Sequence, residues 1–182
     1  FSDGFFLNLN KSNAQVRWER QINTNQKFRD VDANAILDEG RIYISGFDDR
    51  LYAMDAKSGQ IVWSIDYGSV YAPAISGENL VFSTTNGRLL LINKSSGEIK
   101  NTWSAKGIFR EPQVYNNYLI VGDSLGAVSI YDTINWRKLG KFEPGFGVDS
   151  AITIIDEDHF AFISQGANLF EIQYGWKRRS YL

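Results

Sequence analysis

Short apolar runs with strand-like alternation recur along the whole chain, and polar turn sequences separate them. The clearest copy contains four predicted strands, at 34–37, 41–46, 50–54 and 60–65. Each run is rich in Ile, Val, Tyr, Phe and Trp and ends at Gly, Asp, Asn or Ser. No window of helical periodicity carries capping residues at both ends. The pattern therefore predicts an all-β protein.

The same segment returns about every 40 residues. Its clear copies read RLYAMDAKSGQIVW at 50–63, RLLLINKSSGEIKNTW at 88–103 and FFLNLNKSNAQVRW at 5–18, and two weaker copies begin at 127 and 168. One polar anchor residue marks each copy, and the five anchors are Asn10, Asp55, Asn93, Asp132 and Gln173. Four strands repeated at this period are typical of a β-propeller blade.

The anchors divide the chain into five repeats, at about 1–27, 28–66, 67–106, 107–143 and 144–182. The chain begins in the middle of a repeat and without Met, so we interpret it as a fragment of a longer protein. About four four-stranded blades and one incomplete blade would suit a small closed ring or part of a larger one. We favour part of a larger, eight-bladed ring.

The turn that follows the third strand of each blade has its own chemistry. We expect the side chains of Asp55 and Asn93 to hold these turns through Asx hydrogen bonds. Gly59 and Gly97 then supply the residue that tolerates positive φ. These four residues are predicted to have a structural role.

Tryptophans follow the anchors in the fourth strand. Trp18 and Trp63 lie eight residues after their anchors and Trp103 lies ten after its own. Because side chains alternate with period two, the extra two residues keep the same strand face. In the fourth copy Gly140 takes the tryptophan position and Trp136 lies in the turn. We interpret the three indoles as packing residues between neighbouring blades, with ligand stacking as the alternative.

The composition argues against several classes of function. A net charge of −2 gives no strong field for nucleic acid. The absence of cysteine excludes disulfides, thiolate metal sites and cysteine nucleophiles, and no run of 18 apolar residues occurs. The sequence also lacks a nucleophile elbow, a P-loop and a dinucleotide fingerprint. We expect a protein that is not an enzyme and binds neither cofactor nor nucleic acid.

Three polar motifs fit turn chemistry better than a reactive site. His159 follows three acidic residues, Asp48 and Asp49 lie at a predicted hairpin, and Asp123 precedes Ser124 at a strand end. A lone histidine without cysteine or a second histidine is a poor ligand set for a transition metal. We therefore expect no metal site.

The turn that holds Ala53, Asp55, Ser58, Gly59 and Trp63 resembles the tryptophan-docking repeat of quinoprotein-type propellers. Within that superfamily, residues 1–173 resemble the BamB family of outer-membrane assembly lipoproteins. The segment FRDVDANAILDEGRIY at 28–43 is similar to the family's Asp-Val-Asp region. The segment LIVGDSLGAVSIYD at 119–132 is similar to its Val-Val-Gly-Asp-Ser-x-Gly blade. Residues 174–182 extend beyond the family's usual end, as a fourth strand or as a loose tail.

The resemblance implies a non-catalytic scaffold of the β-barrel assembly machinery, at the periplasmic face of the outer membrane and held there by a lipid anchor outside this chain. It places the carboxylates that bind the central, BamA-like subunit on Asp30 and Asp32, beside Arg29. Unfolded outer-membrane proteins would be a second class of partner. The residues alone show two carboxylates on one side of Val31, which suit either a basic partner or a merely solvated edge.

A fragment of a dehydrogenase that uses pyrroloquinoline quinone is the alternative, because such enzymes share the docking turn. They also tend to need a catalytic Asp near a bound calcium, and many carry a vicinal cysteine pair. This chain has no cysteine and no clustered Asp, Glu and Asn set at matching positions. The sequence therefore favours the scaffold.

Overall fold

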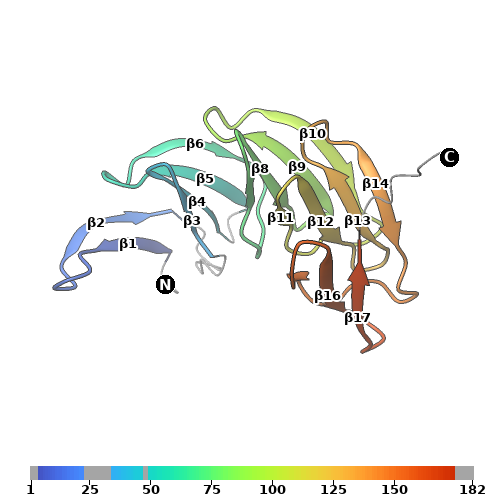
Figure 1. Ribbon diagram of the computed structural model, residues 1–182. Coiled ribbons are helices and arrows are strands. Elements are labelled where there is room, and N and C mark those ends of the chain that lie inside the picture. Colours follow the sequence, from blue (N-terminus) through green and yellow to red (C-terminus); the bar gives the residue numbers. More distant parts are fainter. Residues whose placement is uncertain (1–3, 23–33, 47–48, 175–182) are drawn as a thin grey trace. The chain divides into compact units, whose positions relative to one another are not determined.

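The computed structural model describes residues 4–22, 34–46 and 49–174. In these ranges all of the assigned secondary-structure elements are β-strands. No helix in these ranges is long and apolar enough to cross a membrane. The chain divides into two units, Phe1–Phe109 and Arg110–Leu182, which are described separately. In both, the strands of a sheet follow one another in chain order and pair antiparallel (Figure 1).

The first unit contains three of the sheets. One sheet has two strands, β1 (Phe5–Leu9) and β2 (Val16–Gln21). The next has four, β3 (Ile36–Asp38), β4 (Arg41–Gly46), β5 (Arg50–Asp55) and β6 (Ile61–Ile65). The third also has four, β7 (Ala74–Ser76), β8 (Asn79–Ser83), β9 (Arg88–Asn93) and β10 (Ile99–Ser104).

The second unit contains two sheets. Four strands form the first, β11 (Gln113–Tyr115), β12 (Tyr118–Gly122), β13 (Val128–Asp132) and β14 (Lys138–Phe142). Three described strands form the second, β15 (Thr153–Ile154), β16 (His159–Ile163) and β17 (Leu169–Gln173). A predicted fourth strand of this sheet would fall at 175–182, outside the described residues.

The two middle strands of each four-stranded sheet form the core, because both of their faces are covered. Strands β4, β5, β8 and β9 are buried over most of their length. The largest cluster of the first unit joins adjacent sheets and consists of Tyr43, Leu51, Ala53, Leu80, Phe82, Leu90 and Ile92. Burial of this apolar surface is the main force that holds neighbouring blades together.

The predicted all-β fold is confirmed in the described residues: the strands form antiparallel sheets in chain order, and three of these sheets have four strands, as expected for propeller blades. Strands β4 and β5 begin at the predicted residues 41 and 50. Strand β3 begins two residues later than predicted, since its first ladder pair is Ile36 with Tyr43. The boundaries of the five predicted blades remain a proposal.

Candidate functional site

Asp55 and Asn93 hold two equivalent turns in the first unit, as predicted from the sequence. Asp55 Oδ1 accepts hydrogen bonds from the backbone amides of Lys57 and Ser58 at 3.1 and 2.7 Å, and from the Ser58 hydroxyl at 2.8 Å. These bonds, led by that of the hydroxyl, lower the pKa of Asp55 below its ordinary value. Asn93 Oδ1 accepts from the amides of Ser95 and Ser96, both at 2.9 Å.

Gly59 and Gly97 end these turns, and each lies against a tryptophan from the preceding sheet. Their φ angles are +69° and +77°. A Cβ added to Gly59 would lie 2.6 Å from the Trp18 ring, and one added to Gly97 would lie 2.8 Å from the Trp63 ring. Only glycine combines this backbone conformation with so close an approach.

The indole N–H groups complete the contact. Trp18 Nε1 donates to the carbonyl oxygen of Ala56, and Trp63 Nε1 donates to that of Lys94, both at 3.1 Å. We call these contacts the first docking interface (Trp18 on the turn 55–60) and the second docking interface (Trp63 on the turn 93–98). Both hydrogen bonds go to the residue directly after the anchor, so the repeat sets their position.

Trp103 lies on β10 opposite Leu89, whereas Trp63 lies opposite Ala53. Leu89 lies four residues before its anchor Asn93, and Ala53 lies two residues before its anchor Asp55. The difference of two residues keeps Trp103 on the same strand face as Trp63. In the second unit, a Cβ added to Gly140 would meet nothing within 4 Å. Trp136 adopts φ +58°, at the position that Gly59 and Gly97 occupy in their turns.

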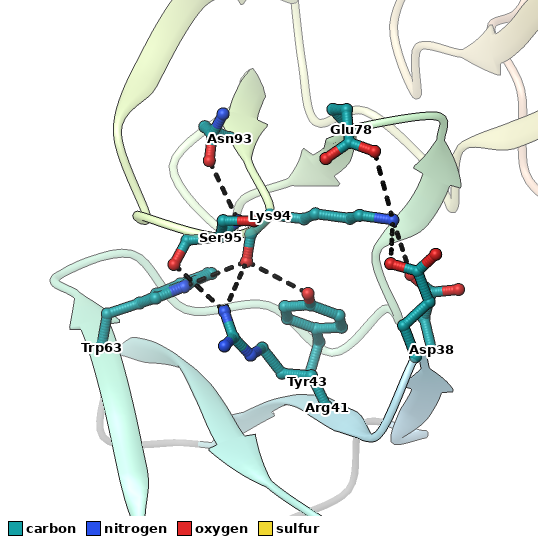
Figure 2. Close-up of polar contacts among 9 residues, drawn as sticks. Asp38, Arg41, Tyr43, Trp63, Glu78, Asn93, Lys94 and Ser95 are labelled. Carbon is teal, nitrogen blue, oxygen red and sulfur yellow. Dashed lines mark hydrogen bonds and ion pairs between the residues drawn. The ribbon is translucent and has the colours of Figure 1, made fainter.

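Lys94 adds a charged cluster to the second docking interface (Figure 2). The side chain is buried, with the residue 7% exposed. Its Nζ lies 2.9 Å from Glu39 Oε2 and 3.0 Å from Asp38 Oδ2, at the turn between β3 and β4 of the preceding sheet. Glu78 of its own sheet lies 3.9 Å away. Hydrogen bonds to Glu39 and Asp38 raise the pKa of Lys94 above its ordinary value.

Two more side chains of the preceding sheet converge on the backbone at Lys94. The Tyr43 hydroxyl donates to the Lys94 carbonyl oxygen at 3.1 Å, and Arg41 donates to the Ser95 carbonyl oxygen at 3.1 Å. Burial raises the pKa of Tyr43. Figure 2 shows Trp63, Tyr43 and Arg41 pointing to one carbonyl region while the lysine side chain extends to the carboxylates. These contacts join two blades directly. We therefore interpret the arrangement as structural and not as a substrate site.

The sequence interpretation did not find the Lys94 cluster. The sequence pattern that could have indicated the cluster is a lysine directly after an anchor, with acidic residues in the first hairpin of the preceding repeat and of its own repeat. That signal is ambiguous, because Lys11 has the same place after Asn10. Only the packing of one sheet on the next identifies which carboxylates the lysine meets.

The connection between β6 and β7 is fixed by hydroxyl hydrogen bonds. The backbone amide of Ser69 donates to Ser45 Oγ at 2.8 Å, and that of Tyr71 donates to Ser69 Oγ at 3.0 Å. The amide of Thr85 donates to the Gly68 carbonyl oxygen at 3.0 Å. This loop therefore has a defined conformation, although it lies outside the strands.

The predicted partner-binding residues Arg29, Asp30 and Asp32 lie outside the described residues. In the chain they belong to the connection between β2 and β3, which is the counterpart of the connection between β6 and β7. Their role remains a proposal.

His159 and Asp123 both take part in turns of the second unit. His159 Nδ1 lies 2.9 Å from Asp156 Oδ1 and 2.8 Å from Asp158 Oδ1, and the hydrogen bond with Asp156 raises the pKa of His159. These three residues are the one group in the described ranges whose ligand atoms come close enough for a metal ion. Asp123 Oδ1 accepts from the Leu125 amide at 3.0 Å, as expected for a turn residue.

Comparison with known proteins identifies similar chains. The family profile described as outer membrane protein assembly factor BamB matches residues 1–105. Outer membrane protein assembly factor BamB of Shewanella oneidensis is 24% identical over 167 residues, covering 86% of this chain and 42% of that protein. The chain spans less than half the length of the curated relatives it matches.

Solved structures support the same fold. The crystal structure of BamB from Moraxella catarrhalis has a TM-score of 0.73 at 18% identity, over 87% of this chain and 49% of that chain. Quinohemoprotein alcohol dehydrogenase from Comamonas testosteroni has a TM-score of 0.75 at 13% identity, over 94% and 39%. At these identities the likeness concerns the fold alone. The profile match covers more than half of the residues, and the chain therefore belongs to the family of outer membrane protein assembly factor BamB.

Proposed function

We propose that the protein is a non-catalytic scaffold of the machinery that assembles β-barrel proteins in the outer membrane. It acts at the periplasmic face and binds the periplasmic domains of the central, BamA-like subunit. Unfolded outer-membrane proteins are a second class of partner. The observation that carries this proposal is the family match over residues 1–105, which includes the Asp-Val-Asp motif at 30–32.

The motif supplies charge at a place suited to recognition. Asp30 and Asp32 flank Val31 and follow Arg29. Two carboxylates separated by one residue attract a basic surface, and such complementarity mainly sets partner choice and the rate of association. The proposal therefore assigns partner binding to the connection between β2 and β3.

The connection between β6 and β7, which is described at the same place in the next repeat, has the order that suits a scaffold. The loop from β6 to β7 is fixed by Ser45 and Ser69, as shown above. A loop that is already ordered loses little conformational entropy when it binds. A rigid blade with ordered connections suits a scaffold, and binding loops on a rigid framework are common in proteins.

The fold likeness to quinohemoprotein alcohol dehydrogenase motivates a second candidate, a quinoprotein enzyme. Such a site needs a cation held by carboxylates beside the quinone. In the described part of the chain, the one suitable group is Asp156, Asp158 and His159, and its atoms already bond to one another on an exposed hairpin. These residues do not fit a buried cofactor. Adding pyrroloquinoline quinone and calcium to the intact protein should produce no cofactor absorbance.

Binding measurements test the scaffold proposal. The intact protein should bind purified periplasmic domains of the central subunit, and the double substitution Asp30→Lys with Asp32→Lys should weaken binding about tenfold or more at low salt. Raised salt should reduce the difference, because it screens exposed charges. The double substitution Glu98→Lys with Glu157→Lys is the control, since it makes the same charge change at exposed turns. Equal binding by wild type and the Asp30/Asp32 variant at both salts would contradict the assignment.

A further inference from the structure

We propose that a cavity beside Gly140 in the second unit binds an indole group, carried by a tryptophan side chain of a partner protein. In the two docking interfaces of the first unit, an indole from the last strand of the preceding sheet fills this place. In the second unit that strand, β14, has glycine at the same position. The inference is independent of the proposed function, because it concerns docking geometry and not the central subunit.

Gly140 has the strand position of a docking tryptophan. It pairs with Ile130 in the ladder of β13 and β14, as Trp63 pairs with Ala53 in the ladder of β5 and β6. Ile130 and Ala53 each lie two residues before their anchors. A Cβ added to Gly140 would meet nothing within 4 Å. Space for a side chain therefore remains on the face of β14 where β6 carries its indole.

The hydrogen-bond acceptor of a docking interface also has a counterpart in this unit. Tyr174 directly follows its anchor, as Lys94 does. The Tyr174 amide donates to the Asp158 carbonyl oxygen at 2.7 Å, and the Lys94 amide donates to that of Glu78 at 3.0 Å. The Tyr174 ring lies edge-on against Tyr118 of the preceding sheet, with 5.4 Å between the ring centroids. The backbone that accepts the indole N–H in the second docking interface thus has its equivalent at Tyr174.

A cavity of about 280 Å³ lies at this end of the sheet, and six residues line it: Asn117, Tyr118, Asp132, Ile134, Arg137 and Leu139. Leu139 is the neighbour of Gly140 on β14, and Tyr118 is the residue that packs on Tyr174. Ile134 is 74% exposed, so a side chain can enter from solvent. Apolar cavities of about 150 Å³ already admit a benzene ring. The space is therefore sufficient for an aromatic side chain.

The lining suits an indole in particular. Tyr118 offers an aromatic ring, and Ile134 adds apolar surface. Arg137 supplies a guanidinium group, and such groups bind the face of an indole more strongly than that of other aromatic rings. Asp132 is already engaged within its turn, since Oδ1 accepts from the Ile134 amide at 2.8 Å and Oδ2 from Asn135 Nδ2 at 3.0 Å. The chemistry therefore favours a neutral aromatic group over a cation.

A tryptophan of a partner protein matches the way in which this fold holds indoles. In both docking interfaces the indole is attached to a strand and donates to a backbone carbonyl oxygen. Buried tryptophans often dominate the binding energy of protein interfaces. An isolated indole derivative makes only this one contact, so its dissociation constant should be about 1 mM.

The experiment titrates the intact, isotope-labelled protein with N-acetyl-tryptophanamide and follows backbone amide signals by NMR. The signals of Tyr118, Ile134 and Leu139 should shift and saturate. N-acetyl-leucinamide should bind about tenfold more weakly, because it lacks the aromatic face. A short peptide with one central tryptophan should shift the same signals, and the same peptide with alanine in its place should not.

Substitutions on β14 and in its turn give the controls. Gly140→Trp supplies the indole from within the sheet and should weaken binding about tenfold or more. Lys141→Trp is the matched control and should leave binding unchanged, because successive side chains of a strand lie on opposite faces. Arg137→Ala, at an exposed position, should weaken binding about threefold and serves as the test if Gly140→Trp does not fold.

Three outcomes would overturn the inference: no saturable shift at the lining residues of the wild-type protein, equal binding of the leucine derivative, or undiminished binding by a folded Gly140→Trp variant. Binding that appears only after Trp176→Ala would also overturn it, because an indole of the protein itself would then occupy the cavity. Trp176 lies outside the described residues. Failure of the protein to bind the central subunit would instead reject the proposed function and leave this inference intact.

Discussion

The first and second docking interfaces have the same geometry but different charges. In both, an indole donates to a carbonyl oxygen at 3.1 Å and lies against a glycine with positive φ. The accepting residue is Ala56 in the first interface and Lys94 in the second. Asn8 also donates to the Ala56 carbonyl oxygen, at 3.1 Å, whereas Tyr43 donates to that of Lys94.

The difference shows which part of the contact the repeat encodes. The accepting group is a backbone carbonyl, so the side chain at that position is free to vary between blades. In the second interface the side chain is a buried lysine that three carboxylates from two sheets approach. In the first it is alanine, and Arg20 instead donates to the Gly59 carbonyl oxygen at 3.0 Å. Docking is thus common to both, while the charged cluster is specific to one.

The largest expected effect comes from removing the indole of the second interface. Trp63→Ala should destabilise the protein by about 3–5 kcal/mol, because it deletes a large packed ring and its hydrogen bond. Chemical unfolding followed by circular dichroism measures the change. Val62→Ala on the same strand is the control and should cost little, because Val62 is half exposed. Similar losses of unfolding free energy for the two variants would show that the docking contact does not stabilise the protein more than an exposed residue of the same strand does.

The next effect concerns the glycine beneath the indole. Gly97→Ala should cost about 2–3 kcal/mol, since the new Cβ would both adopt positive φ and overlap the Trp63 ring. Gly77→Ala separates the two causes, because Gly77 has φ +55° but nothing within 4 Å of an added Cβ. It should cost only about 1 kcal/mol. Equal costs would mean that the positive φ alone, without the Trp63 ring, accounts for the cost of the substitution.

A smaller effect should distinguish the interfaces by charge. Lys94→Met should lower stability at neutral pH, because it leaves Asp38, Glu39 and Glu78 without their shared cation. The loss should be smaller than for Gly97→Ala, because the side chains of Glu39 and Glu78 are largely exposed and remain solvated. Lys57→Met, at an exposed position of the turn in the first interface, should have little effect.

The pH dependence of the lysine contribution follows from its raised pKa. The contribution is fully present below the unfolded value of about 10.4 and is lost as pH rises through the folded pKa. The difference in unfolding free energy between wild type and Lys94→Met should therefore stay constant around neutral pH, where the carboxylates are ionised, and shrink in alkaline solution. A difference that shrinks at acidic pH well above the carboxylate pKa values would contradict this origin.

The smallest effect should come from the two anchors. Asp55→Asn should lower stability only slightly at neutral pH, because an amide oxygen accepts the same bonds in the equivalent turn of Asn93 but lacks the carboxylate charge that strengthens them. The lowered pKa of Asp55 gives a contribution that is present above about pH 3.9 and lost as pH falls through the folded pKa. The wild-type advantage should hence disappear in acid. Asn93→Asp is the reciprocal variant and should gain that acid sensitivity.

The sequence predicted the parts of this protein that depend on local interactions. The period near 40 residues indicated blades, and the turns at Asp55 and Asn93 have the expected side-chain hydrogen bonds. The spacings of Trp18, Trp63 and Trp103 predicted a common strand face, and the registers of β6 and β10 agree. Such features follow from alternation along a strand and from short-range turn chemistry, which one chain segment determines by itself.

Only the tertiary structure decided which residues meet across sheets. Three contacts join segments that are more than 20 residues apart: the ion pairs of Lys94, the hydroxyl contact of Tyr43 and the hydrogen bond of the Ser69 amide with Ser45. Sequence placed a lysine after Asn10 and after Asn93 alike, with nothing to show that one would be buried among carboxylates. Long-range contacts depend on how one sheet packs on the next, and that packing is fixed by the shared apolar core rather than by any single segment.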